Sequence, residues 1–292
     1  MGTWVRSIAE ILIGGIEAGS VYILIAAGLS LLYGVTKIFN YSYGSLLTLG
    51  GYFAWVLIFN FAGIHYGIGI VVVLPVMFFL GMGIEKLIVF PLRRKAEWEL
   101  NVVIATLGLA LIFNSLILVV FGPLTKTLPP LIEGNMKIGG CILSNYRWAV
   151  LGITIAVMII LWIFLTKTKL GMAMRAVAQD SVGGHIVGIN THRLFGYTFG
   201  ISTVLAGLGG IFLGSTYFLS PEGGWLFFVK AFIIVALGGI GSLQGALIAA
   251  IILGVIESSV CFLIGAVWVT PAWFLVLIII LIIRPKGLFG IR

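Results

Sequence analysis

The sequence predicts an all-α polytopic membrane protein with eight to nine membrane segments, and three observations support this fold class. Hydrophobic residues make up 61% of the 292 residues, the mean hydropathy is +1.23, and only 9% of the residues are Asp, Glu, Lys or Arg. Apolar runs of roughly 20 residues, the length that a helix needs to cross the hydrocarbon layer, follow one another along the chain. Membrane strands would instead show segments of about ten alternating residues.

Nine apolar segments are expected in order along the chain, at 8–33, 42–62, 67–90, 101–121, 147–166, 195–217, 226–241, 243–264 and 268–283. The segment 226–241 is short for a full crossing and contains Gly238, Gly239 and Gly241. Glycine permits the broken helices that membrane proteins use along polar paths. We therefore expect 226–241 to be half of a broken or re-entrant helix, with 243–264 completing the geometry.

The distribution of positive charge predicts an orientation, because Lys and Arg near membrane ends prefer the cytoplasm. If the N-terminus lies outside and the C-terminus inside, most of the 17 Lys and Arg are cytoplasmic. The exceptions are Arg6, Lys126, Lys137, Arg147 and Lys230. The net charge of +8 is therefore interpreted as a topology signal. Binding of nucleic acid is not predicted, because no basic cluster lies on a polar domain.

Two pairs of segments resemble each other. "AAGLSLLYG" (26–34) is followed by "LLTLGGYFA" (46–54), and "LAGLGGIFLG" (205–214) is followed by "IIVALGGIGS" (233–242). The predicted topology runs the two pairs in opposite directions, as in the inverted repeats of transporters. The alternative is chance similarity in a chain with 40 glycines.

The motifs point away from an enzyme and toward transport. The sequence has no H-E-x-x-H or G-x-S-x-G motif, and all three histidines fall in expected loops. It has no P-loop either, so an ATP-driven process would need an ATPase on another chain. Glu17 and Glu257 lie within apolar segments, where an ionisable residue is costly and needs a partner or water. An ion-coupled secondary transporter using Glu257 is therefore the alternative from a different class.

The polar stretch 171–196 is the only long loop expected on the cytoplasmic side. Its first part favours helix, and Asp180 or Ser181 is expected to cap a second short helix that carries Val182, Ile186 and Ile189 on one face. This helix is interpreted either as a docking element for a partner or as an amphipathic helix on anionic lipid. The Gly183-Gly184 pair disfavours an isolated helix there.

Four blocks of the sequence, in order, resemble the permease subunits of branched-chain amino acid ABC importers of the LivH type. They are "GSVYILIAAGLSLLYGVTKIFNYSYG" (19–44), "RAVAQDSVGGHIVGINTHRLFGYTF" (175–199), "KAFIIVALGGIGSLQGALIAAIILGVIES" (230–258) and "RPKGLFG" (284–290). The chain departs from the family pattern at Tyr41-Ser42-Tyr43-Gly44, where F-A-H/Q-G is usual, and at Gly183-Gly184, where small helix formers are common.

The resemblance implies that residues 1–292 form one transmembrane permease domain in the cytoplasmic membrane, with a cytoplasmic coupling loop at 167–194. It also implies a second permease subunit, two cytoplasmic P-loop ATPases that hold ATP and Mg, and an extracytoplasmic substrate-binding protein. The chain itself is expected to hold no cofactor or metal and to contact lipid. The residues expected to dock on the ATPases are Arg175, Ala176, Asp180, Gly183, Gly184, Gly188, Ile189, Asn190 and Arg193.

The predicted function is passage of branched-chain or related amino acids, without covalent chemistry in this chain. The translocation path is expected along Asn40, Tyr43, Ser45, Thr48, Thr106, Asn114, Gly238, Gly239 and Ser242. Polar side chains at depth and backbone exposed at glycine breaks can accept a small zwitterion. The bland alternative for each Ser or Thr is a hydrogen bond to its own helix. An importer of the same architecture for urea, short amides or other amino acids is the alternative function.

Overall fold

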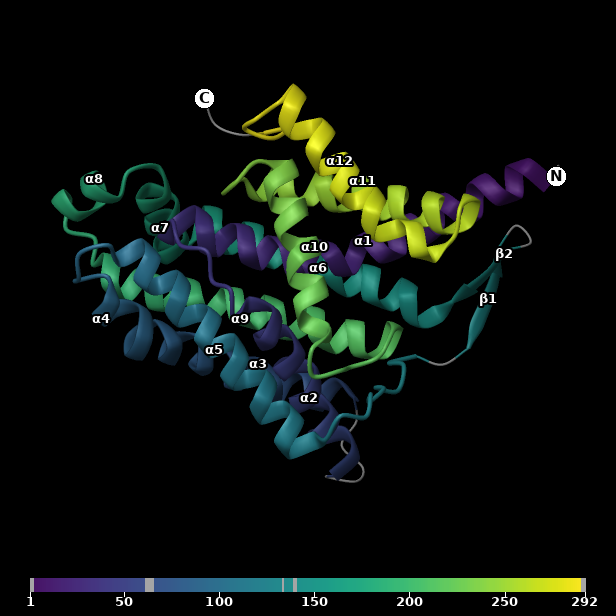
Figure 1. Ribbon diagram of the computed structural model, residues 1–292, viewed down its shortest axis with the longest axis horizontal. Helices are drawn as coiled ribbons and strands as arrows, with labels where there is room; N and C mark the ends of the chain where they lie inside the picture. Colours follow the sequence, from purple (N-terminus) through teal and green to yellow (C-terminus); the bar gives the residue numbers. More distant parts are fainter. Residues whose placement is uncertain (1–2, 61–65, 133, 139–140, 290–292) are drawn as a thin grey trace.

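The computed structural model describes residues 3–60, 66–132, 134–138 and 141–289 and confirms an all-α membrane fold (Figure 1). Seven helical spans in this part of the chain are long and apolar enough to cross a membrane. They are Ser7–Thr36, Tyr66–Leu92, Trp98–Phe121, Asn145–Lys167, Thr191–Thr216, Leu243–Leu263 and Ala266–Ile283. Within the described residues, all nine predicted segments are helical, and the two remaining ones form the shorter helices α2 (Tyr43–Asn60) and α10 (Gly223–Gly238); residues 61 and 62 of the segment predicted at 42–62 lie outside the described residues.

The long helices give the molecule two distinct ends (Figure 1). One, here the hairpin end, carries the start of α1 (Thr3–Thr36) and the antiparallel strands β1 (Asn135–Ile138) and β2 (Cys141–Ser144). The other, here the α8 end, carries α4 (Phe90–Leu92), α7 (Lys169–Gln179) and α8 (Ser181–Ile186). Four further helices connect the two ends: α3 (Tyr66–Ile84, continued by the π-helix Glu85–Val89), α5 (Trp98–Phe121), α6 (Asn145–Lys167) and α11 (Leu243–Leu263).

Helices α1 and α9 (Thr191–Thr216) form the centre of the bundle. In each, 83% of the most apolar window is buried, whereas the other spans bury 11–28% and present their apolar faces outward, as expected for lipid contact. Small residues allow the two central helices to pack closely: Ser202 Oγ donates a 2.8 Å hydrogen bond to the carbonyl of Gly28, and a Cβ at Gly28 would meet Leu205. Because lipid tails are as apolar as Leu, this close packing is what holds membrane helices together.

The two short helices α2 and α10 meet where they begin. A Cβ at Gly44 or at Gly224 would overlap the backbone of the other residue, so glycine at both positions allows the two helix starts to touch. Figure 1 shows α10 running across the long central helices rather than along them. The prediction of a short helix at 226–241 is thus confirmed, with bounds shifted to Gly223–Gly238.

The packing of the helices follows the order expected for an inverted repeat of α1–α3 and α9–α11. Helix α11 lies along α1, and α3 lies along α9, while α2 and α10 pack against each other between them. Helices α1 and α9 run in opposite directions, since Glu17 and Thr216 line one cavity while Gly28 contacts Ser202. Each half therefore packs its first helix against the third helix of the other half, and this symmetry supports the repeat over chance similarity.

Candidate functional site

The polar loop at the α8 end folds as two short helices, α7 and α8, with capped ends. The Asp180 carboxylate accepts hydrogen bonds from the amides of Val182 (2.9 Å) and Gly183 (3.0 Å), so Asp180 is the N-cap of α8. In the same way, Asn190 accepts a 3.1 Å bond from the amide of Arg193 at the start of α9. These bonds satisfy helix amides that have no partner within the helix. The capping role predicted for Asp180 is confirmed.

The Gly183-Gly184 pair lies inside α8, and the break between the two helices falls at Asp180, whose φ and ψ are −146° and 107°. A Cβ at Gly183 would lie 2.6 Å from Asp180 Oδ2, and one at Gly184 would lie 2.8 Å from Val177 Cγ2. Larger residues would therefore push α8 away from its own cap and from α7. Glycine here permits the sharp corner between the helices, which outweighs its low helix propensity.

The outer face of α8 is apolar and open. Val182, Ile186 and Val187 are 69%, 79% and 75% exposed, whereas Ile189 is half-buried. Of the other residues predicted for docking, Gly184 is buried and Gly183 is half-buried, and the rest are exposed: Arg175, Ala176, Asp180, Gly188, Asn190 and Arg193. The structure thus gathers the predicted residues in one protruding unit, and Val187 is a further apolar residue on it.

This unit is joined to the membrane helices through the start of α9. The His192 ring stacks on Phe90 of α4, with 3.5 Å between centroids, and its Nδ1 lies 3.5 Å from Oε1 of the buried Glu85. Glu85 begins the π-helix, a distortion often found at functional sites. His192 thus joins the start of α9, which follows α8 in the chain, to α4 and to the π-helix that continues α3.

Arg93 forms a second connection at the same end. Its guanidinium lies 3.9 Å from the Phe195 ring centroid of α9 and donates a 3.1 Å hydrogen bond to the carbonyl of Thr36 at the end of α1. Burial lowers the pKa of Arg93 to about 10, with Glu85 opposing the shift, so the side chain stays charged near neutral pH. A cation held against an aromatic ring ties α1, α4 and α9 together.

The residues predicted for the translocation path fall into two separate groups. The first lies where α2 meets α5. Ser45 donates hydrogen bonds to Asn114 Oδ1 (2.8 Å) and to a carbonyl of α5, and Thr106 Oγ1 accepts one from the amide of Tyr41. Asn40 accepts from Ser42, Tyr43 donates to the carbonyl of Ile25, and Thr48 bonds to its own helix.

The second group lies at the turn between α10 and α11, near the α8 end. Gly238 packs against Gly245, Gly239 adopts a φ of 102°, and Ser242 caps α11 by accepting a 3.1 Å bond from the Gly245 amide. In this conformation both groups hold helices together. The alternative of a hydrogen bond to the residue's own helix is met by Thr48, which donates to the carbonyl of Gly44, and by Thr106, which donates to that of Val103.

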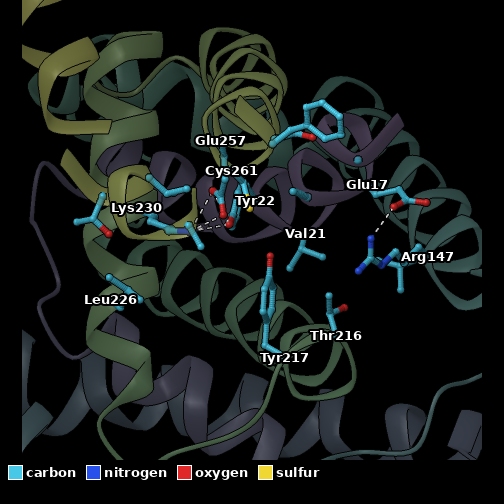
Figure 2. A pocket seen from close by; sticks show the side chains of 18 residues that line it. Glu17, Val21, Tyr22, Arg147, Thr216, Tyr217, Leu226, Lys230, Glu257 and Cys261 are labelled. Carbon is cyan, nitrogen blue, oxygen red and sulfur yellow. Dashed lines mark hydrogen bonds and ion pairs between the residues drawn. The ribbon is translucent and has the colours of Figure 1, made fainter. Parts of the chain in front are cut away.

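A cavity of about 730 Å³ at the hairpin end contains two ion pairs and is lined by none of the predicted path residues (Figure 2). Arg147 Nη1 lies 2.9 Å from Glu17 Oε2, and Lys230 Nζ lies 3.0 Å from Glu257 Oε2. The cavity lies where α6 and α12 (Val269–Ile283) begin and where α9 and α11 end. Figure 2 shows the side chains of Tyr217 and Val21 between the two pairs.

The Lys230–Glu257 pair is the more deeply buried of the two. Lys230 Nζ also donates a 2.8 Å hydrogen bond to the Tyr22 hydroxyl, which in turn donates one of 2.9 Å to Glu257 Oε2. The ammonium lies 5.0 Å from the ring centroid of the buried Trp273. A charge at this depth needs a partner, and the prediction that Glu257 has one is confirmed.

The sequence singled out both carboxylates but not the cations that face them. The charge distribution predicts only that Lys230 and Arg147 lie on the outer side, and Lys230 lies in the middle of α10. Arg147 does lie at the start of α6, and its partner is on α1. The signal in the sequence was Lys230 itself, a lysine inside an apolar segment. Burying its charge in a membrane costs free energy, as it does for Glu257, so it too needs a partner.

Comparison with known proteins assigns the chain to a family. Residues 11–284 match the family described as branched-chain amino acid transport system, permease component. The chain is 30% identical to the high-affinity branched-chain amino acid transport system permease protein BraD of Pseudomonas aeruginosa, over 96% of this chain and 94% of that protein. It is 29% identical to the corresponding LivH of Escherichia coli K12, over 94% and 93%.

A second kind of permease is also similar. LivM of Escherichia coli K12 is 28% identical over 80% of this chain and 60% of its own length. No solved structure shows significant similarity to the chain. The described residues contain no group of three or more His, Cys, Asp or Glu that could hold a metal. The fold, the apolar spans and the family match agree, and the chain therefore belongs to the permease components of branched-chain amino acid transport systems.

Proposed function

We propose that this chain is the permease subunit of an ATP-driven importer for branched-chain or related amino acids. The family match over residues 11–284 carries the proposal, together with relatives whose names describe high-affinity branched-chain amino acid transport. The chain contains no P-loop, so the energy must come from partner chains. Its own work is to pass the substrate and to transmit motion, with no covalent step.

The proposed assembly contains a second permease subunit, two cytoplasmic ATPases that hold ATP and Mg, and an extracytoplasmic binding protein. Similarity to both LivH and LivM supports a two-permease system. The α8 end faces the cytoplasm and the hairpin end faces outward, in the inner membrane. The excess of Lys and Arg at the α8 end supports this orientation.

The α7–α8 unit is proposed to dock on an ATPase. An apolar helix face flanked by Arg175 and Arg193 fits a groove on a partner, because exposed Val and Ile side chains gain most from burial. When the ATPases close on ATP, the unit moves the start of α9, on which α7 and α8 pack, and His192 and Arg93 pass this motion to α4 and α1.

The path residues remain part of the proposal as surfaces that open during the cycle. Ser45, Asn114 and Thr106 already bridge α2 and α5, and separating these helices would free their polar groups for a passing zwitterion. The turn at Gly238, Gly239 and Ser242 would do the same at the α8 end.

Uptake by cells that express the complete importer tests the substrate class. We expect labelled L-leucine to accumulate and an excess of unlabelled valine or isoleucine to compete with it, whereas urea and acetamide do not. Competition by urea or acetamide, with none by valine, would instead favour an amide importer of the same architecture.

A further inference from the structure

The charged cavity at the hairpin end has the chemistry of an amino-acid site. Its four charged side chains, Glu17, Arg147, Lys230 and Glu257, comprise two anions and two cations. A zwitterion likewise carries one charge of each sign and no net charge. The carboxylate of such a ligand can pair with a cation of the cavity while its ammonium group pairs with an anion, so that no charge is left unpaired. A ligand with a net charge would leave one charge without a partner.

Glu17 has an unused acceptor within this cavity. Its Oε2 accepts from Arg147, but no group in the described ranges donates a hydrogen bond to Oε1, although the residue is only 8% exposed. A buried carboxylate oxygen without a donor costs free energy, so it is a strong acceptor for an ammonium group that enters the cavity.

Stability alone gives a poor reason for these charges. Replacing a buried ion pair by well-packed apolar residues is often neutral or stabilising, so a stabilising role is a weak explanation for Lys230 and Glu257. Ionisable residues within membrane segments are rare and usually mark a substrate or ion pathway. Glu257 lies within the last two turns of α11, roughly 10 Å from its end, so an incoming solute would reach it early.

The rest of the cavity suits an aliphatic side chain. Val21, Leu226, Phe262 and Val269 line it beside the charged groups, and Tyr217 points between the two ion pairs (Figure 2). Tyr22 and Trp273 support Lys230 from behind, with their rings edge to face at 5.3 Å. A polar cluster beside an apolar wall matches the two parts of a small apolar amino acid.

We propose that this cavity is a transit site for the transported amino acid on the outer side of the permease. Lys230 and Arg147 receive its carboxylate, Glu257 and Glu17 receive its ammonium group, and the apolar wall receives its side chain. The internal ion pairs compete with the ligand and re-form when it leaves, which keeps the site weak enough for passage. This inference rests on the proposed function and deepens it.

The test uses the complete importer with Lys230→Met, Glu257→Gln and the double variant. Lys126→Met and Glu222→Gln are matched controls, since they make the same changes of side chain at residues that do not line the cavity. Leucine uptake is measured together with complex assembly and with ATP hydrolysis stimulated by the binding protein. We expect each cavity variant to assemble and hydrolyse ATP, while the maximal uptake rate falls about tenfold or more and KM, set by the binding protein, stays near its wild-type value.

The double variant separates a transit site from a merely structural ion pair. If the pair only stabilises the fold, removing both charges leaves none unpaired, and uptake returns toward the wild-type rate. If the groups contact the substrate, the double variant stays as slow as either single variant. If the wild-type complex imports leucine and the double variant imports it equally well, the transit site is wrong but the proposed function stands. If the wild-type complex imports no amino acid, both the proposed function and the site are wrong.

Discussion

At the scale of single residues, glycines and helix caps determine how closely the helices approach and where they turn. Gly210 of α9 packs on the carbonyl of Leu47 in α2, where any Cβ would overlap the backbone. Gly108 of α5, by contrast, has no atom within 4 Å of the Cβ position. Gly210 thus has no space for a larger side chain, whereas Gly108 does.

Substitution of these two glycines by alanine should have opposite effects. Gly210→Ala forces α2 and α9 apart and should cost about 1–3 kcal/mol, as overpacking does. Gly108→Ala should be neutral or gain up to about 1 kcal/mol, because Ala favours helix. Thermal unfolding of the purified protein in detergent measures both, and equal melting temperatures for the two variants would show that the α2–α9 contact is looser than described.

Asp180 offers a second residue-scale prediction. Asp180→Ala removes the acceptor for the Val182 and Gly183 amides and should cost α8 about 1 kcal/mol, whereas Asn keeps an oxygen in that place.

We expect Asp180→Ala with Arg193→Ala to uncouple ATP hydrolysis from uptake while membrane insertion is unchanged. Asp180→Asn with native Arg193 should import normally, and normal uptake by the double Ala variant would contradict the docking role.

At the scale of elements, α8 is a six-residue helix whose exposed side is apolar at the end of the molecule proposed to face the cytoplasm. Helix α8 packs on α7 and on α9, and the start of α9 contacts α4 through His192 on Phe90 and Arg93 on Phe195. Both bring rigid rings or a fixed cation against helices that cross the membrane. This arrangement suits transmission of a rigid displacement rather than flexible tethering.

A charged substitution on α8 should therefore abolish docking. Val182→Asp with Ile186→Asp places two carboxylates on the face proposed to be buried, and the ATPases should no longer co-purify with the permease. Leu124→Asp, an exposed apolar residue in the loop before β1, is the control and should leave co-purification unchanged. Retention of the ATPases by the α8 variant would favour the amphipathic helix on lipid instead.

At the scale of the whole molecule, the sequence predicted the class and the segments well, because spans of roughly 20 apolar residues are set by membrane thickness. The cap at Asp180 was also predictable, since it depends on neighbouring residues alone. The charged cavity was not, because Glu17 meets Arg147 and Lys230 meets Glu257 across helices that are distant in sequence or separated by a turn. Such meetings depend on how α1, α6, α10 and α11 pack.

The glycine pair at 183–184 illustrates the same limit. Helix propensity alone weighs against a helix there, yet both residues are helical, and the corner with α7 brings Asp180 Oδ2 and Val177 Cγ2 within 2.6 and 2.8 Å of where their Cβ atoms would lie. Tertiary packing outweighed local preference, as it often does.

ATP-dependent uptake in proteoliposomes tests the central claim most directly. The permease is reconstituted with its second permease subunit and ATPases, labelled L-leucine and the binding protein are supplied on the hairpin side, and ATP with Mg is supplied on the α8 side. We predict leucine accumulation that requires ATP hydrolysis and the binding protein and that persists when proton and sodium gradients are collapsed. Uptake by the permease alone, driven by an ion gradient without ATP, would contradict this prediction.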